Sequence, residues 1–145
     1  MAATTPAAFD PKPKNLGLVL DMIAGSAILA GQVVTFNATG VDWTVEPVDS
    51  DTSLVAPMVG VALYSQATVG GRIAIASHGS VIKVCEGAGA AIDAGDYLMA
   101  SGAAGCVVTA TDGADASYLG LAVTDIGANS TGYALITMQY AAKGA

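Results

Sequence analysis

Basic residues are scarce in this sequence, which has five Lys and Arg against twelve Asp and Glu and a formal net charge of -7. Nucleic-acid binding depends on clustered Lys and Arg that contact phosphates, so we expect no nucleic-acid partner. Charged residues of both signs make up only 12% of the chain, too few for long solvated helices with ion pairs. A weakly charged exterior is common in proteins that bury part of it against copies of themselves or another partner.

Residues that usually carry chemistry are also few. The only histidine, His78, lies in a Ser-His-Gly sequence between two strand-like runs, where we expect a turn residue and no catalytic base. Cys85 and Cys106 stand in apolar surroundings without the paired spacing of metal sites. We interpret both as small buried hydrophobic residues in preference to a disulfide, although the sequence leaves their pairing open.

The closely spaced carboxylates do not form a recognisable metal loop, because a calcium site needs several oxygen ligands at defined spacing around a glycine. Capping of turns by Asp side chains explains them better. These pairs are Asp49 with Asp51, Asp93 with Asp96, and Asp112 with Asp115. We therefore expect no catalytic, cofactor-binding or metal-binding residues, and no enzymatic activity.

Long apolar runs are missing as well. The uncharged stretch over residues 22–41 contains four polar residues and four other Gly or Ser positions, so we expect no membrane span there. The first residues lack the basic start and apolar core of a secretory signal, so the sequence predicts synthesis in the cytoplasm without export and without a membrane partner.

A twofold internal repeat is the strongest pattern present. Residues 57–63 (PMVGVAL) return as residues 117–123 (SYLGLAV), each preceded by an Ala-Gly entry and followed by a Gly-opened alternating run. The entries are residues 30–35 and 94–99, and the runs are residues 71–75 and 132–136, so the three landmarks are offset by 64, 60 and 61 residues. Such self-similarity indicates one β module written twice.

Four glycines mark this repeat and are predicted to be structural: Gly31 and Gly95 at the strand entries, Gly60 and Gly120 at the strand centres. Glycine inside a strand weakens it unless a bulge, a bend or a close backbone approach requires it. At the strand centres we favour a bend where a strand crosses between two sheets.

Alternating apolar residues and Val, Ile, Thr and Tyr usage predict about ten short strands and no long helix. The expected fold is an all-β, jelly-roll-like sandwich or barrel. One domain is predicted over residues 16–145, with repeat halves at about 24–86 and 87–140 and a meander formed by residues 58–64, 72–77 and 81–85. The expected strands lie at residues 16–23, 32–37, 43–45, 58–64, 72–77, 81–85, 97–100, 106–110, 118–124 and 133–140.

Residues 1–15 differ in composition, since they contain three of the five prolines. Proline fixes φ and biases the preceding residue towards extended geometry, so an extended arm outside the core is expected. It is interpreted either as a disordered terminus or as an arm that docks on a neighbouring molecule. The candidate contact residues are Phe9, Pro11, Lys12, Pro13 and Lys14.

Five segments together resemble the small cement, or decoration, proteins of tailed-bacteriophage capsids: AGQVV at 30–34, VGVA at 59–62, GRIAIASHG at 71–79, IDAGD at 92–96 and LGLA at 119–122. The resemblance implies a jelly-roll-like domain on the outer surface of the virion, assembled as a homo-oligomer, with a dimer favoured and a trimer possible. It implies binding to a major capsid protein of the HK97-type fold, bridging of neighbouring subunits, and neither cofactor nor catalysis.

Two other functions remain open at this point. A small carbohydrate-binding or adhesive β domain would present several exposed aromatics, whereas the single tryptophan, Trp43, is more typical of a core or an interface. A lipoyl or biotinyl carrier also has two quasi-repeated halves, but it needs a modifiable lysine at a hairpin tip. Lys83 instead lies within a strand-like run.

Overall fold

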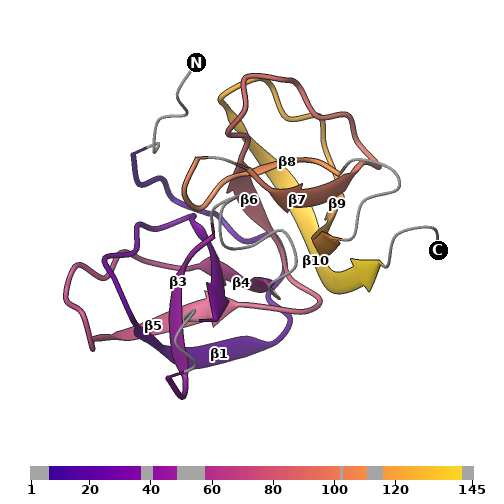
Figure 1. The fold of residues 1–145 in the computed structure, drawn as a ribbon. Coiled ribbons are helices and arrows are strands. Elements are labelled where there is room, and N and C mark those ends of the chain that lie inside the picture. Colours follow the sequence, from indigo (N-terminus) through magenta and orange to yellow (C-terminus); the bar gives the residue numbers. More distant parts are fainter. Residues whose placement is uncertain (1–6, 37–40, 49–57, 102, 111–115, 142–145) are drawn as a thin grey trace.

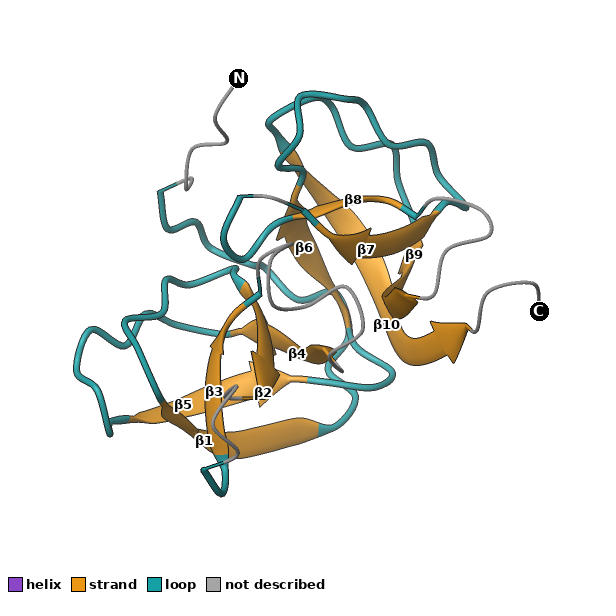
Figure 2. Cartoon of the chain, viewed as in Figure 1, coloured by secondary structure: helices purple, strands orange, loops and turns teal. Residues whose placement is uncertain are grey.

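The computed structural model describes residues 7–36, 41–48, 58–101, 103–110 and 116–141, with no side-chain description for 116–117 and 138–141. Ten strands and no helix occur in these ranges (Figure 2), so no helix there could cross a membrane. The all-β prediction is confirmed. The strands are β1 (Val19–Ala24), β2 (Val33–Phe36), β3 (Thr44–Pro47), β4 (Met58–Ala62), β5 (Arg72–Ala76), β6 (Val81–Cys85), β7 (Tyr97–Ala100), β8 (Val107–Thr109), β9 (Ala116–Ala122) and β10 (Thr131–Ala141).

The first five strands form a closed barrel in the order β1-β3-β2-β4-β5. Its ring is completed by a parallel pair between β1 and β3, in which Ile23 faces Thr44 and Ala24 faces Val45. β1 also pairs antiparallel with β5 over five residues. This unit forms one lobe of the molecule (Figure 1).

The last five strands form a second sheet in the order β6-β10-β9-β7-β8. Read from β1 in the other direction, the barrel has the order β1-β5-β4-β2-β3, so each strand of the second sheet occupies the place of the strand five earlier. The sheet is almost a ring too, because an isolated parallel bridge joins Glu86, which follows β6, to Val107, the first residue of β8. The predicted repeat is therefore confirmed as two five-stranded units of equal topology.

Hydrogen bonds in the two units correspond closely. Gly31 N–H donates to Ala62 O at 2.9 Å, and Gly95 N–H donates to Ala122 O at 2.8 Å. The alignment of β5 with β10 needs a correction of two residues. Ile23 and Cys85 are equivalent positions, and they pair with Arg72 and Thr131, which are therefore equivalent too. The third landmark is thus offset by 59 residues instead of 61, because the loop before β10 differs in length and glycine recurs on both sides of the correct position.

The predicted boundary between the halves also needs correction. β6 was expected to end a meander with the two strands before it, but it pairs with β10 and belongs to the second unit. Its hydrophobic pattern fits either neighbour equally well, and only the tertiary structure selects β10. The units therefore divide between β5 and β6, at residues 77–80.

Hydrophobic packing joins the units. One buried cluster fills the barrel and includes Ile28, Val45 and Ile73. A larger cluster takes Val33 and Met58 from the first unit together with residues of the second, among them Leu98, Leu119 and Ile136. The two units consequently share one core, in which β4 packs against β9 and β10.

The glycines at the strand centres, Gly60 and Gly120, are required because another backbone segment approaches them closely. A Cβ at Gly60 would collide with the carbonyl oxygen of Ala76, and one at Gly120 with the carbonyl oxygen of Leu135. Gly60 pairs with Val34 and Gly120 with Leu98, which are equivalent positions. The expected bend between sheets is replaced by this approach, accompanied at Gly60 by a β-bulge.

Candidate functional site

The N-terminal segment lies against the body of the protein over residues 7–15, so the expectation of an arm outside the core is wrong for this part; residues 1–6 fall outside the described residues. Lys14 N–H donates to Val81 O at 2.8 Å, Val81 N–H donates to Asn15 O at 2.9 Å, and Lys83 N–H donates to Pro11 O at 2.9 Å. These bonds cover the edge of β6 that does not face β10. An unpaired edge leaves backbone donors and acceptors unsatisfied, and the segment satisfies them.

Phe9 anchors this segment to both units. Its N–H donates to Ala30 O of the first unit at 3.2 Å. Its ring lies against Gly31, where a Cβ would collide with the ring, and packs on the buried cluster of Cys85, Ala103 and Cys106. Pro11 is buried, while Lys12, Pro13 and Lys14 are exposed. Gly31 thus combines a positive φ of 87° with room for Phe9.

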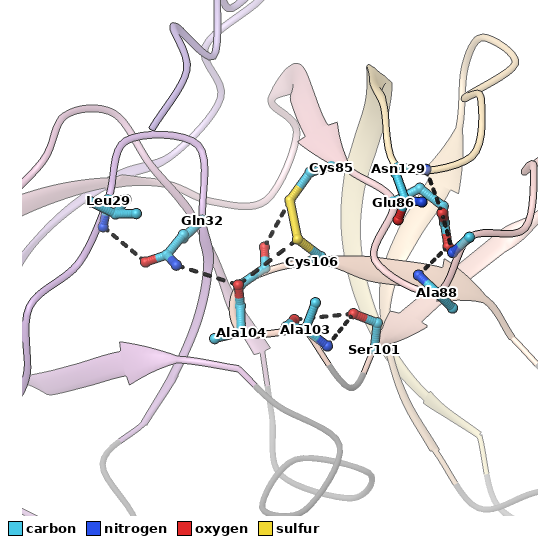
Figure 3. Close-up of a disulfide and its surroundings, with 12 residues drawn as sticks. Leu29, Gln32, Cys85, Glu86, Ala88, Ser101, Ala103, Ala104, Cys106 and Asn129 are labelled. Atoms are coloured by element: carbon cyan, nitrogen blue, oxygen red, sulfur yellow. Dashed lines mark hydrogen bonds between the residues drawn. A yellow bond between two sulfur atoms is a disulfide. The ribbon is translucent and has the colours of Figure 1, made fainter. Parts of the chain in front are cut away.

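Cys85 and Cys106 form a disulfide, which corrects the interpretation of two unpaired thiols. Their Cα atoms are 4.9 Å apart, and both residues are almost fully buried. Figure 3 shows the bond beside the loop that carries Ala103 and Ala104, where the Gln32 side-chain amide of the first unit donates to Ala104 O at 3.3 Å. The apolar surroundings of the two cysteines are compatible with either state, and the sequence does not reveal that their strands are adjacent.

Three lysines gather where the N-terminal segment crosses β6. Lys83 faces Tyr133 directly across the β6–β10 pair. The ammonium groups of Lys14 and Lys83 lie 5.5 Å and 5.7 Å from the centre of the Tyr133 ring, and the exposed Lys12 follows the buried Pro11. We call Lys12, Lys14, Lys83 and Tyr133 the lysine surface. Sequence analysis found its two arm lysines but missed Lys83 and Tyr133, which only the register of β6 on β10 brings to them.

A second polar surface lies at the turns before β7 and β10. The Asp125 carboxylate accepts the N–H of Ala94 at 2.9 Å, and the Asp96 carboxylate accepts the N–H of Asp93 at 3.1 Å. The expected turn-capping role of the Asp93 and Asp96 pair is confirmed. We call Asp93, Asp96 and Asp125 the acidic corner; the other two predicted carboxylate pairs lie outside the described residues.

A pocket of about 320 Å³ adjoins this corner and is lined by Asp96, Thr109 and the rings of Tyr97 and Tyr118. The ring centres are 5.4 Å apart. The Thr109 hydroxyl donates to the Asp96 carboxylate at 3.3 Å. The pocket therefore offers a carboxylate beside two tyrosine side chains.

Trp43 is 65% exposed, so it is not part of the core. It lines a groove of about 620 Å³ with Val19, Ile23 and Arg72 of β1 and β5, and an adjoining one of about 360 Å³ with Phe36 and Asp42. Its φ of 60° lies in the left-handed region, which is unusual for a bulky residue. The equivalent residue of the second unit is Gly105, at φ 76°.

The remaining candidate residues, His78 and Glu86, contact the backbone of neighbouring segments. His78 is exposed at a turn, and its Nδ1 lies 3.2 Å from Thr137 O, as expected for a turn residue. The carboxylate of the buried Glu86 accepts backbone N–H groups of the neighbouring turns, including those of Gly89 at 2.9 Å and Asn129 at 2.8 Å. Within the described residues, no three His, Cys, Asp or Glu side chains group as metal ligands.

The structural glycines at the strand entries complete the predicted site residues. Gly95 has a φ of 94° and open space where a Cβ would stand, so its conformation alone favours glycine. Gly95 also lines the pocket beside Asp96.

Comparison of the sequence with known protein families and with curated proteins finds no match.

Proposed function

We propose that the protein is a capsid cement protein that binds the outer surface of an icosahedral phage head and bridges subunits of its major capsid protein, which has the HK97-type fold. It acts there as a homo-oligomer in the virion, without cofactor or catalysis. The observation that carries this proposal is the resemblance of five sequence segments to cement proteins. Four of them include the glycines that occupy equivalent positions in the two units.

The surface of the protein supports a role in binding. Charged residues are few, apolar side chains such as Leu18, Val69 and Trp43 are exposed, and the groove at Trp43 has no partner within the described chain. The N-terminal segment, proposed as a contact, presents Lys12 and Lys14 on a backbone that the body already holds. A held segment loses less conformational entropy on binding than a free arm does.

The direct test is co-expression with a major capsid protein, followed by purification of assembled particles. We expect this protein on the particles in a near-stoichiometric ratio to the shell protein. Reversal of charge in Lys12→Glu/Lys14→Glu should weaken retention, because these side chains are exposed and their backbone contacts survive the change. Lys143→Glu, which reverses a charge outside the N-terminal segment, serves as the control. Particles that assemble without binding the wild-type protein would refute the proposal.

A carbohydrate-binding or adhesive domain is a second candidate, and Trp43 is the observation that favours it. A bulky residue kept at a left-handed position, where the other unit has glycine, costs about 1–2 kcal/mol, and such strain is concentrated at functional positions. The exposed ring stands beside Phe36, Asp42 and the ion pair of Arg72 with Asp21, a combination of aromatic faces and polar groups.

A glycan array separates the two functions. Binding that is lost in Trp43→Ala but kept in Tyr64→Ala, which removes another exposed aromatic outside the groove, would support sugar recognition. Absence of binding on the array by the wild-type protein would eliminate this candidate and leave the capsid proposal untouched.

A further inference from the structure

The lysine surface is electrostatically incomplete. Two ammonium groups share the ring of Tyr133, yet the single ion pair among the described residues joins Arg72 to Asp21. The carboxylate of the nearby Asp10 accepts the backbone N–H of Lys12 at 3.0 Å. Like charges held close together repel, and an incoming carboxylate would relieve this repulsion as well as gain attraction.

The rest of the chain has the opposite character. Apart from these three lysines, it has two basic residues, Arg72 and Lys143, against all twelve acidic residues. Two copies therefore repel each other in most orientations. They attract each other when the lysine surface of one copy faces an acidic part of the other. The charge distribution therefore favours this relative orientation of the two copies.

The acidic corner and its pocket match a lysine in two ways. The described residues provide no cation that pairs with Asp93, Asp96 or Asp125. The pocket puts the Asp96 carboxylate beside the rings of Tyr97 and Tyr118, and an ammonium group is attracted both to a carboxylate and to an aromatic face. The pocket volume of about 320 Å³ accommodates the end of a lysine side chain.

We propose that the protein associates with a second copy of itself, the lysine surface of one copy binding the acidic corner of the other. The contact would form the homo-oligomer that the proposed function includes. It rests on that part of the proposed function alone, because it requires no capsid. Each copy carries both surfaces, so the contacts are made reciprocally in a closed dimer or in succession along an open chain.

Sedimentation velocity of the purified full chain tests this contact without particles. We expect a species larger than the monomer at about 50 mM salt that dissociates by about 500 mM, because screening shortens the reach of exposed charges to a few ångströms. Lys14→Glu/Lys83→Glu should lower the association constant at least tenfold, and Lys14→Arg/Lys83→Arg should retain it. Lys143→Glu, which reverses a charge at a residue that is not part of the lysine surface, should leave it unchanged.

Mixing two variants gives the sharper result. Asp93→Lys/Asp96→Asn reverses one charge of the acidic corner and removes another, and Asn can still accept the turn hydrogen bond at position 96. Each variant alone should be monomeric. An equimolar mixture with Lys14→Glu/Lys83→Glu should form no more than one-to-one complexes, because one intact lysine surface and one intact acidic corner remain.

Circular dichroism would establish that each variant keeps its strands. A wild-type protein that is monomeric at every salt concentration overturns the inference, as does an association that the lysine reversals leave intact. The two proposals can fail separately. A wild-type protein that self-associates but does not bind particles supports this contact and refutes the capsid proposal, and one that binds particles but stays monomeric does the opposite. Association of the wild type that withstands high salt would assign it to the apolar surface and contradict the charge contact.

Discussion

The two five-stranded units have the same strand order, but their rings are closed by different bonds. In the first unit, Ile23 and Thr44 are neighbours in the parallel pair that closes the barrel. Their equivalents in the second unit, 62 residues later, are Cys85 and Cys106, and these are joined by the disulfide. One ring is completed by a short hydrogen-bonded ladder and the other by a covalent bond with one bridge beside it.

The reason lies in the loop before β8. In the first unit the Trp43 carbonyl accepts the N–H of Ile23 at 2.7 Å. The equivalent carbonyl, that of Gly105, instead accepts the N–H of Val33 at 2.9 Å, and Gly105 N–H donates to Val48 O at 2.7 Å. The loop before β8 is thus hydrogen-bonded to the first unit. The comparison shows that one copy of a repeat can give up part of its closing ladder for contacts with the other copy when a disulfide closes the ring instead.

The largest effect is expected from Gly120→Val, which should destabilise the fold by more than about 3 kcal/mol, because the Leu135 carbonyl occupies the space of a side chain. Gly60→Val should behave similarly if the units are equivalent. Gly95→Ala, where the space is open, is the control and should cost only about 1 kcal/mol. Thermal and urea unfolding measure all three. An unchanged melting temperature of Gly120→Val would contradict the close approach, and a large loss in only one of the two valine variants would contradict the equivalence.

Removal of the disulfide should have the next largest effect. Cys85→Ser/Cys106→Ser opens a loop with a sequence separation of 21, for which chain entropy predicts a loss of about 3 kcal/mol. Urea unfolding with and without reductant measures it, and reductant should not alter the double variant. If the disulfide closes the second ring, hydrogen exchange should increase at β6 and β8 more than at β1 and β3. A uniform increase would argue against a local closure.

Phe9→Ala should destabilise the protein by about 2 kcal/mol, less than a fully buried phenylalanine, because the ring is only partly covered. The N-terminal segment should then become sensitive to protease near Lys12 and Lys14, with the strands intact. Lys12→Ala controls for general loosening of the segment. Unaltered protease resistance of Phe9→Ala would show that the backbone bonds to β6 suffice.

Trp43→Gly sharpens the comparison because it is expected to stabilise the fold, whereas the variants above destabilise it. Replacing a left-handed tryptophan by the residue of the second unit should raise the unfolding free energy by about 1 kcal/mol, reduced by any packing that the ring loses. Trp43→Ala removes the ring without relieving φ and is the control. A melting temperature of Trp43→Gly at or below that of Trp43→Ala would refute the strain.

The smallest effect is expected where the units use different side chains for one purpose. Ser65 Oγ accepts the N–H of Ala30 at 2.9 Å, and the Asp125 carboxylate does the same for Ala94. Asp125→Ser should therefore change stability by no more than about 0.5 kcal/mol, while Asp125→Ala, which leaves Ala94 without this acceptor, should cost about 1 kcal/mol. Equal losses in both variants would show that the hydroxyl does not substitute.

The sequence by itself determined the strands and the repeat. Alternation at 81–85 and 97–100 located β6 and β7 with the observed bounds, and Gly60 and Gly120 identified equivalent strands, because local side-chain pattern and backbone space are properties of short segments. Only the tertiary structure decided which strands are neighbours: the assignment of β6 to the second unit, the Cys85–Cys106 pair, and the placement of the N-terminal segment on β6. The candidate surfaces divide in the same way. Lys12 and Lys14 stand out in the composition, whereas Lys83 and Tyr133 join them through sheet register and Trp43 is exposed by the shape of the barrel, and both depend on contacts between residues far apart in the chain.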